Sequence, residues 1–255
     1  MHFAFYSAFI ILYTGVLLTN TYSCDTIIMY YYSFLTVEAH MVQDFSKKID
    51  NKLSPKLNYS ITTPTNFSKE EKLPLIVFLH GAGERGDDIN KVKVYCVPKL
   101  FGANPDLERV VTLSPQCPHN YTWYDFKWDV IELIEDVVKE YNIDSDRVTL
   151  CGISMGGFGT WEIAMQMPDM FSAIAPLCSG GMSWRTWSLT KLPIRVYHGR
   201  RDDVVPFAYS ELMVNAIKAQ GGNVDFIAYD DLSHNCWDRA FEESDLIHWL
   251  ANSKK

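Results

Sequence analysis

The feature that most constrains the fold of this chain is a series of short apolar runs, separated by segments with helical periodicity. The runs are residues 57–63, 73–79, 109–113, 147–151, 173–177, 194–198 and 224–229. The helical segments are residues 128–141, 157–167, 208–219 and 239–250. Most of the runs are continuously apolar, which is typical of strands buried on both faces of a parallel sheet. Residues 57–63 alternate instead, which favours a strand at the edge of the sheet.

Strands that alternate with helices pair in parallel through right-handed crossovers, so helices cover both faces of the sheet. We therefore predict an α/β fold in a single domain, with a mostly parallel, doubly wound sheet. A chain of 255 residues is long enough to bury a sizeable core. Sheets of this kind place their chemistry at the carboxyl ends of the strands, so functional residues are expected there.

Residues 1–40 differ in composition from the rest of the chain. They contain no Lys or Arg, and residues 3–18 are mostly apolar. A secretory signal begins with a positive region that is missing here, and a spanning helix needs about 20 apolar residues. Three interpretations are open: a weak signal or anchor, an additional membrane-associated element, or a gene-model extension ahead of a true start at Met41. The abrupt change at Met41 favours the third, with residues 41–255 as the folded domain.

Localisation follows from the same choice. The protein is cytoplasmic if translation begins at Met41, and secreted or membrane-attached if the leader is genuine. A membrane is therefore a partner only if residues 1–40 are a real anchor. The net charge of −8 and the lack of a basic run argue against nucleic acid as a partner.

The six cysteines show no CxxC pair and no zinc-ligand spacing, so neither a metal site nor a disulfide scaffold is predicted. Cys151 lies within an apolar run and is predicted to be a buried free thiol. Cys117 and Cys236 are predicted to lie in loops near the functional edge of the sheet. A disulfide between these two stays open, because sequence alone does not reveal pairing.

One strand–helix connection has the pattern of a nucleophile. Residues 152–156 read Gly-Ile-Ser-Met-Gly, directly after a predicted strand and before a predicted helix. In such a turn the serine occupies strained backbone, and side chains at the flanking positions would clash. The helix that follows directs its amides at a developing oxyanion. The pattern favours Ser154 as a nucleophile, and the alternative is a glycine-rich connection of a kind common in α/β folds.

A serine nucleophile needs a base, and the base needs an acid to orient it. Among the seven histidines, His234 stands in a loop between the last strand and the last helix, from which an imidazole can reach the serine. The alternative for His234 is a residue near a helix start. Asp202 and Asp203 follow the run 194–198 and supply the acid. The order Ser, Asp, His along the chain is that of α/β-hydrolases, not of chymotrypsin or subtilisin.

The remaining part of such a site is an oxyanion hole. One donor is expected to be the amide of Met155, the residue after the nucleophile, and the other should follow an earlier strand. Residues 80–86 read His-Gly-Ala-Gly-Glu-Arg-Gly after the run 73–79, and the amide of Ala82 is the candidate. This loop lacks the Gly-Lys-Ser/Thr of a phosphate-binding loop.

Together these segments resemble the α/β-hydrolase esterases. The resemblance covers residues 55–250 and is carried by LPLIVFLHGAGERGDD, LSPQCP, GISMGGFGTWE, VYHGRRDDVVP and HNCWDRAF. The chain is similar to carbohydrate esterases of the acetyl-xylan and feruloyl type, to the phospholipase/carboxylesterase group, and to the catalytic domain of the prolyl oligopeptidase family. The resemblance implies the α/β-hydrolase fold, Asp202 rather than Asp203 as the acid, and the Ala82 amide as an oxyanion donor.

The activity that the resemblance implies is hydrolysis of carboxylic esters through an acyl-enzyme, without a metal or an organic cofactor. The implied substrate is a small-molecule or polysaccharide-linked ester with an acetyl or feruloyl group. Alternatives are a prolyl oligopeptidase-like serine peptidase, a lysophospholipase or acyl thioesterase, and a catalytically inactive binding protein on the same fold. The oligomeric state cannot be read from the sequence.

Three side chains are predicted to contact the substrate: Gln116, Trp123 and Trp237. Each stands in a predicted loop near the site, and aromatic side chains suit a carbohydrate or aryl ester. Trp237 follows His234 by three residues. Packing in the core is the alternative for each of them.

Overall fold

The computed structural model describes residues 41–47 and 57–255, so the predicted leader lies outside the described residues. The described strands form one eight-stranded sheet in the order β1-β2-β4-β3-β5-β6-β7-β8. The strands are β1 (Met41–Lys47), β2 (Leu57–Thr63), β3 (Leu75–Leu79), β4 (Val111–Gln116), β5 (Val148–Ile153), β6 (Ala173–Leu177), β7 (Ile194–Gly199) and β8 (Val224–Tyr229). Pairing is parallel from β4 through β8, whereas β2 runs antiparallel to β1 and β4. The predicted α/β fold with a mostly parallel sheet is confirmed.

Helices cover both faces of this sheet. The α-helices are α2 (Cys96–Leu100), α3 (Lys127–Glu140), α4 (Met155–Gln166), α5 (Ala208–Ala219), α6 (Trp237–Glu242) and α7 (Leu246–Asn252). The 3-10 helices are η1 (Ala82–Glu84), η2 (Ile89–Lys93), η3 (Pro105–Leu107), η4 (Pro168–Met170) and η5 (Ser183–Leu189). Within the described part of the chain, none of these helices has both the length and the apolar character of a bilayer-crossing segment.

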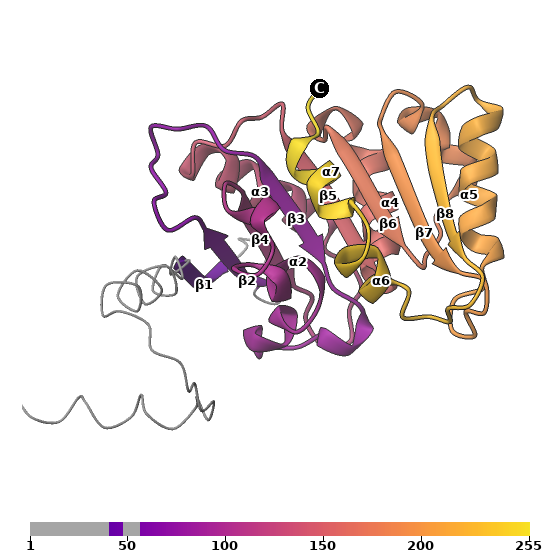
Figure 1. The fold of residues 1–255 in the computed structure, drawn as a ribbon, viewed down its shortest axis with the longest axis horizontal. Helices are drawn as coiled ribbons and strands as arrows, with labels where there is room; N and C mark the ends of the chain where they lie inside the picture. Colours follow the sequence, from indigo (N-terminus) through magenta and orange to yellow (C-terminus); the bar gives the residue numbers. More distant parts are fainter. Residues whose placement is uncertain (1–40, 48–56) are drawn as a thin grey trace, which may run out of the picture. The chain divides into compact units, whose positions relative to one another are not determined.

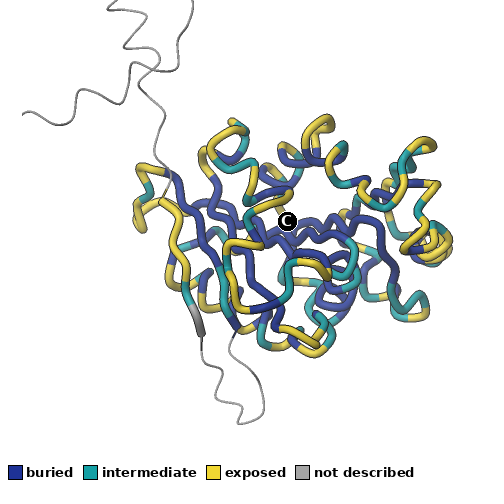
Figure 2. Tube along the Cα trace, turned by 90° about the horizontal axis from the view of Figure 1, so that it is seen from below, coloured by how far each residue is buried: buried dark blue, intermediate teal, exposed yellow. Residues whose placement is uncertain are grey.

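Strand β3 contributes side chains to both hydrophobic cores, one on each face of the sheet. Successive side chains of a strand point to opposite faces, and all of its residues are buried. Leu75, Val77 and Leu79 pack with the α3, α4 and α5 side chains. Ile76 and Phe78 pack with those of α2, α6 and α7. Figure 1 shows α6 and α7 in front of the strands, and Figure 2 shows the strands as a dark blue buried layer between exposed segments.

Strand β2 is not at the edge of the sheet, which corrects the prediction from its alternating pattern. It lies between β4 and β1, and β1 pairs with it over its whole length. The sequence did not indicate β1 because Met41 and Val42 are 53% and 52% exposed, so no apolar run marks the strand. Backbone pairing with β2 defines it instead.

The segment predicted as one helix at residues 239–250 contains two helices, α6 and α7. Ser244 separates them, because its hydroxyl donates to the Ala240 carbonyl (2.6 Å) and accepts from the Leu246 amide (3.2 Å). A side chain that supplies such bonds competes with the helical backbone pattern.

Helix α4 begins at Met155, two residues before its predicted start, so its first turn directly follows Ser154.

The five cysteines among the described residues are buried free thiols. Cys151 is therefore a buried thiol, as predicted. Cys117 and Cys236 are also free, so the disulfide that the sequence left open is not formed in this structure.

Candidate active site

Three loops at the carboxyl ends of parallel strands bring Ser154, Asp202 and His234 together. Ser154 follows β5, Asp202 follows β7, and His234 follows β8. The Ser154 hydroxyl lies 2.9 Å from Nε2 of His234, and Nδ1 of His234 lies 2.8 Å from Oδ2 of Asp202. With Nδ1 donating to the carboxylate, Nε2 is left as the acceptor for the serine proton. The three residues are thus joined by two consecutive hydrogen bonds, although 80 positions separate Ser154 from His234.

Ser154 is held in strained backbone at the junction of β5 and α4. Its φ of 53° and ψ of −119° lie in a region that side chains rarely adopt. The neighbouring glycines permit this turn, because a Cβ on Gly152 would overlap the Gly156 carbonyl and a Cβ on Gly156 would overlap that of Leu79. The strain presents the hydroxyl at the amino end of α4, where backbone amides have no helical partner.

The Asp202 carboxylate is fully buried and accepts four hydrogen bonds. Oδ1 accepts from the amides of Val204 (2.9 Å) and Val205 (2.8 Å). Oδ2 accepts from His234 and also from Nε2 of His198 at 3.0 Å. Burial acts to raise the pKa of Asp202, but the bonds from His234 and the two amides outweigh it and hold that pKa below its usual value. Asp203, the other acid that the sequence offered, is exposed.

The loop after β3 lies directly beside the serine. A Cβ built on Gly81 would be 3.7 Å from the Cβ of Ser154. Ala82, the next residue, is exposed and begins η1, and its carbonyl accepts from Nε of Arg85 at 2.9 Å. Gly81, the residue before Ala82, and Met155, the first residue of α4, therefore border the serine.

A buried histidine, His80, holds this loop from within. Its Nδ1 donates to the Gly81 carbonyl (2.6 Å), and its Nε2 accepts from the Cys117 amide (2.9 Å). Burial lowers the pKa of His80 to about 4, so the ring is neutral at physiological pH and keeps one donor and one acceptor. The sequence showed a histidine followed by glycine at a strand end, but no role for it.

Gln116 and Trp123, which were predicted to contact the substrate, are both fully buried. Nε2 of Gln116 donates to the carbonyls of Glu84 (2.9 Å) and Asp88 (2.8 Å). Nε1 of Trp123 donates to the His80 carbonyl at 3.0 Å. Neither side chain is open to a substrate, which corrects the prediction that they contact it. Both side chains instead donate hydrogen bonds to carbonyls of the segment that follows β3. Their position in the sequence near the site did not reveal whether these side chains face the substrate or the protein interior.

Trp237, the third predicted contact, is partly buried and stands against the candidate base. Its ring meets the imidazole of His234 edge to face, with centroids 5.3 Å apart, and the ring of Tyr95 at 6.2 Å. Its Nε1 is buried without a hydrogen-bond partner among the described residues. A role in substrate contact stays a prediction for this residue.

The described residues contain no cluster of three His, Cys, Asp or Glu side chains that could hold a metal ion. What the arrangement offers is a hydroxyl, an imidazole and a buried carboxylate in sequence, with backbone amides beside the hydroxyl. Sequence reasoning missed His80 and His198. The available signal was the same for both, a histidine followed by glycine at the end of a predicted strand.

The phospholipase/carboxylesterase family model matches residues 109–251, which is more than half of the chain. The chain belongs to this family. Its members share the α/β-hydrolase architecture that the sheet order and the serine turn display here.

Individual relatives agree with the family. A bifunctional acetylxylan esterase/xylanase of Neocallimastix patriciarum is 36% identical over 87 residues, covering 34% of this chain and 13% of that protein. The crystal structure of a thermostable esterase is 30% identical with a TM-score of 0.76, covering 84% of this chain and 63% of that one. This chain therefore spans less than two thirds of either relative.

A feruloyl esterase module of Clostridium thermocellum, complexed with sinapinate, is 16% identical with a TM-score of 0.65, over 84% of this chain and 87% of that one. At this identity the similarity shows the fold alone.

Proposed function

We propose that this phospholipase/carboxylesterase family member is a serine hydrolase that cleaves carboxylic esters. Ser154 is the nucleophile, His234 the general base and acid, and Asp202 the group that orients His234. The observation that carries the proposal is the pair of hydrogen bonds from Ser154 to His234 (2.9 Å) and from His234 to Asp202 (2.8 Å). Family membership supports the same activity.

In the first half of the reaction, the Ser154 hydroxyl oxygen attacks the ester carbonyl carbon while its proton moves to Nε2 of His234. The buried Asp202 carboxylate, whose pKa lies below its usual value, remains ionised and stabilises the imidazolium. The amides of Ala82 and Met155 donate to the oxyanion. The C–O bond to the alcohol then breaks, and His234 returns the proton to the departing oxygen.

In the second half, water replaces the alcohol. His234 takes a proton from the water as it attacks the acyl-enzyme, and gives that proton to Ser154 Oγ when the acid leaves. The serine, imidazole and carboxylate end as they began. Every step uses groups of this chain and one water molecule.

The substrate class is an acetyl or feruloyl ester, either small or linked to a polysaccharide. The name of the acetylxylan esterase/xylanase relative supports the acetyl ester, and the feruloyl ester is retained from the resemblance of the sequence motifs.

The direct test compares the full-length chain with Ser154→Ala on p-nitrophenyl acetate, methyl ferulate and an aminoacyl p-nitroanilide. Loss of the nucleophile should reduce kcat by about 10⁴- to 10⁶-fold. The exposed Ser68→Ala is the matched control and should retain full activity. Ester turnover that survives Ser154→Ala would refute the assignment, and amide turnover above ester turnover would favour a peptidase.

The identity of the acid is tested by paired variants. Asp202→Asn should lower kcat by about 10⁴-fold, because the imidazole loses its orienting carboxylate. Asp203→Asn is the control at the adjacent, exposed position and should stay within about twofold of the wild type. A larger loss at Asp203 would reverse the assignment.

A further inference from the structure

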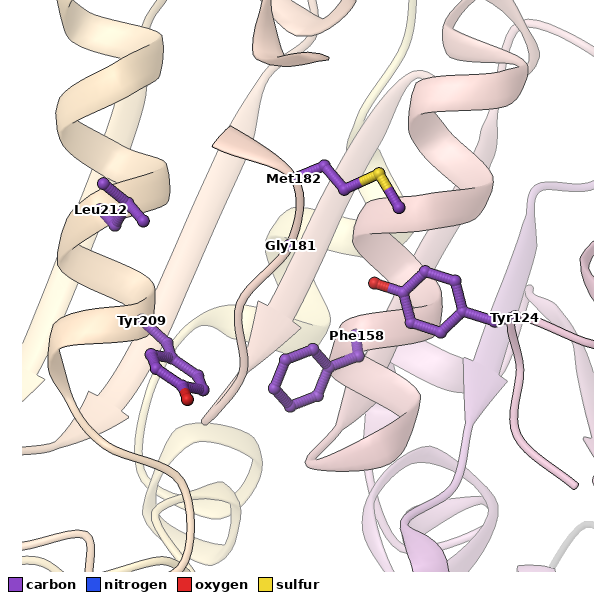
Figure 3. Close-up of a pocket in the computed structure, with 6 residues that line it drawn as sticks. All are labelled: Tyr124, Phe158, Gly181, Met182, Tyr209 and Leu212. Carbon is purple, nitrogen blue, oxygen red and sulfur yellow. The ribbon is translucent and has the colours of Figure 1, made fainter. Parts of the chain in front are cut away.

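A pocket of about 230 Å³ lies between the amino-terminal halves of α4 and α5. It is lined by Tyr124, Phe158, Gly181, Met182, Tyr209 and Leu212. Figure 3 shows the Tyr124 hydroxyl pointing toward the space between Met182 and Phe158, with Tyr209 on the α5 side. None of the lining side chains is charged, and three of them are aromatic. We call it the aromatic pocket.

Two residues that line the aromatic pocket, Phe158 and Tyr209, connect to the segments that carry the proposed catalytic residues. Phe158 lies one helical turn after Ser154, and its amide donates to the Ser154 carbonyl at 3.1 Å. Helical side chains lean toward the amino end of the helix, so the Phe158 ring lies toward the turn that holds the serine. Tyr209 packs edge to face against Phe158, with centroids 6.4 Å apart, and precedes Ser210, which contacts His198. The pocket thus adjoins the segments that carry the nucleophile and the acid.

Trp237, which stands beside His234, and the aromatic pocket lie on opposite faces of the sheet. His234 must protonate the departing alcohol, and its neighbour Trp237 packs against the core on the α2, α6 and α7 face. Met182, inside the aromatic pocket, packs against the core on the opposite face, with α3, α4 and α5. An ester whose alcohol oxygen lies at His234 therefore directs its acyl group away from α6, toward the pocket.

We propose that the aromatic pocket binds the acyl half of the ester and prefers an acyl group that carries an aromatic ring. This rests on the proposed esterase function. The volume of about 230 Å³ is below the roughly 300–1,000 Å³ of pockets that enclose a whole ligand, so one ring enters rather than an entire substrate. Burial raises the pKa of Tyr124, with Glu162 adding to the effect, so its hydroxyl stays protonated and can donate to a ring substituent.

Two isomeric esters test which half of the substrate enters the pocket: methyl 3-phenylpropanoate has the ring in the acyl group, and 2-phenylethyl acetate has it in the alcohol. Tyr209→Ala should lower kcat/KM about three- to tenfold for the first ester and leave the second within about twofold. Leu212→Trp, at a lining position that is 55% exposed, should narrow the pocket. It should likewise lower kcat/KM for methyl 3-phenylpropanoate more than for 2-phenylethyl acetate. Trp128→Ala, a 56% exposed aromatic that does not line the pocket, is the control.

Equal losses for the two isomers, or a loss confined to 2-phenylethyl acetate, would overturn the acyl assignment while the esterase function stands. A binding measurement separates the proposals further. Calorimetry of 3-phenylpropanoate with Ser154→Ala should show binding that Tyr209→Ala weakens in the double variant. Binding that does not respond to Tyr209 would also overturn the assignment. Failure of the wild type to hydrolyse p-nitrophenyl acetate would instead contradict the proposed function.

A second observation, independent of the pocket, concerns the other histidine on Asp202. His198 ends β7 and is fully buried. Its Nε2 lies 3.0 Å from Asp202 Oδ2 and 3.0 Å from the Val205 carbonyl, while Nδ1 lies 2.8 Å from Ser210 Oγ. Both neighbours of Nε2 are acceptors, so Nε2 carries a proton and donates. The Ser210 hydroxyl lies 2.7 Å from the Ser179 carbonyl and fixes the far side of the ring.

We propose that His198 is a positioning residue, which holds the Asp202 carboxylate in the orientation that His234 requires. Oδ2 is shared between two histidines, so the bond from His198 weakens the pull of the carboxylate on the His234 proton. Asp202 and His234 are the charged or titratable groups that act on His198, and the Cys178 thiol near Asp202 stays neutral because burial raises its pKa. Phe207 covers the ring edge to face at 5.4 Å.

The test compares His198→Gln, whose amide can still donate to Asp202, with His198→Leu, which cannot. His198→Leu should lower kcat about ten- to hundredfold, with little change in KM. The acidic limb of the pH–kcat profile of His198→Leu should move to higher pH. The reason is that a carboxylate freed from His198 favours the His234 imidazolium. His198→Gln should recover most of kcat and the wild-type limb. Equal losses in the two variants, with an unmoved acidic limb, would contradict the positioning role.

Discussion

The turns at the carboxyl ends of β3 and β5 are both rich in glycine, but the glycines do different work. In the β5 turn, a Cβ on Gly152 or Gly156 would overlap backbone, and Ser154 sits at a φ of 53°. In the β3 turn, a Cβ on Gly83 would meet nothing within 4 Å, and one on Gly86 would meet the His119 side chain rather than backbone. Buried side chains, with His80 first among them, shape that turn instead. Close backbone contact therefore determines the shape of the β5 turn, and hydrogen bonds from buried side chains determine that of the β3 turn.

The sharpest way to break the β5 turn is Gly156→Ala. The added methyl group would overlap the Leu79 carbonyl, so β3 or α4 must shift. We expect the free energy of unfolding to fall by about 3 kcal/mol and ester hydrolysis to be lost. Urea unfolding and p-nitrophenyl acetate turnover measure both. Wild-type stability in this variant would mean that the turn is not set by backbone contact.

The β3 turn should respond to acid through His80. Because burial holds its pKa at about 4, the unfolded chain takes up this proton near pH 6.5 and the folded chain only near pH 4. The contribution of neutral His80 is therefore present above pH 6.5 and decreases as pH falls to 4, by about 3 kcal/mol at most. In urea unfolding from pH 7 to 4, the stability difference between wild type and His80→Gln should narrow. A constant difference would contradict burial of a neutral ring.

A smaller effect is expected from Gln116, which donates to two carbonyls of the same loop. Gln116→Met keeps much of the volume and removes both donors, at a cost of about 1–3 kcal/mol in the free energy of unfolding. Ester turnover should fall with it, since the Ala82 amide loses support. An unchanged kcat in a destabilised variant would separate the loop's stability from its part in the oxyanion hole.

The smallest effect should come from Gly83→Ala, the counterpart of Gly156→Ala in the other turn. Open space surrounds the position, so the free energy of unfolding should change by less than about 0.5 kcal/mol. Activity should remain near that of the wild type. A loss comparable to that of Gly156→Ala would erase the distinction between the two turns.

Prediction from sequence succeeded where a local pattern carries the structure. Continuous apolar runs marked the parallel strands, and the helix at Ala208–Ala219 has the predicted bounds. It failed at β1, where exposed side chains leave no pattern, and at Ser244, where one hydroxyl divides a helix. Gln116 and Trp123 were misplaced because a polar or aromatic residue near a site looks the same whether it faces the substrate or the core.

By itself the sequence determined the alternation of strands and helices, the glycine turn around Ser154, and the order Ser154, Asp202, His234 along the chain. These are local, because hydrophobic periodicity and the steric needs of a turn act over a few residues. Only the tertiary structure decided that His80 bonds Cys117, 37 positions away, and that Asp202 lies between His198 and His234. Such partners are chosen by the packing of the sheet, because a buried donor or acceptor must find its partner among whatever chain the fold brings beside it.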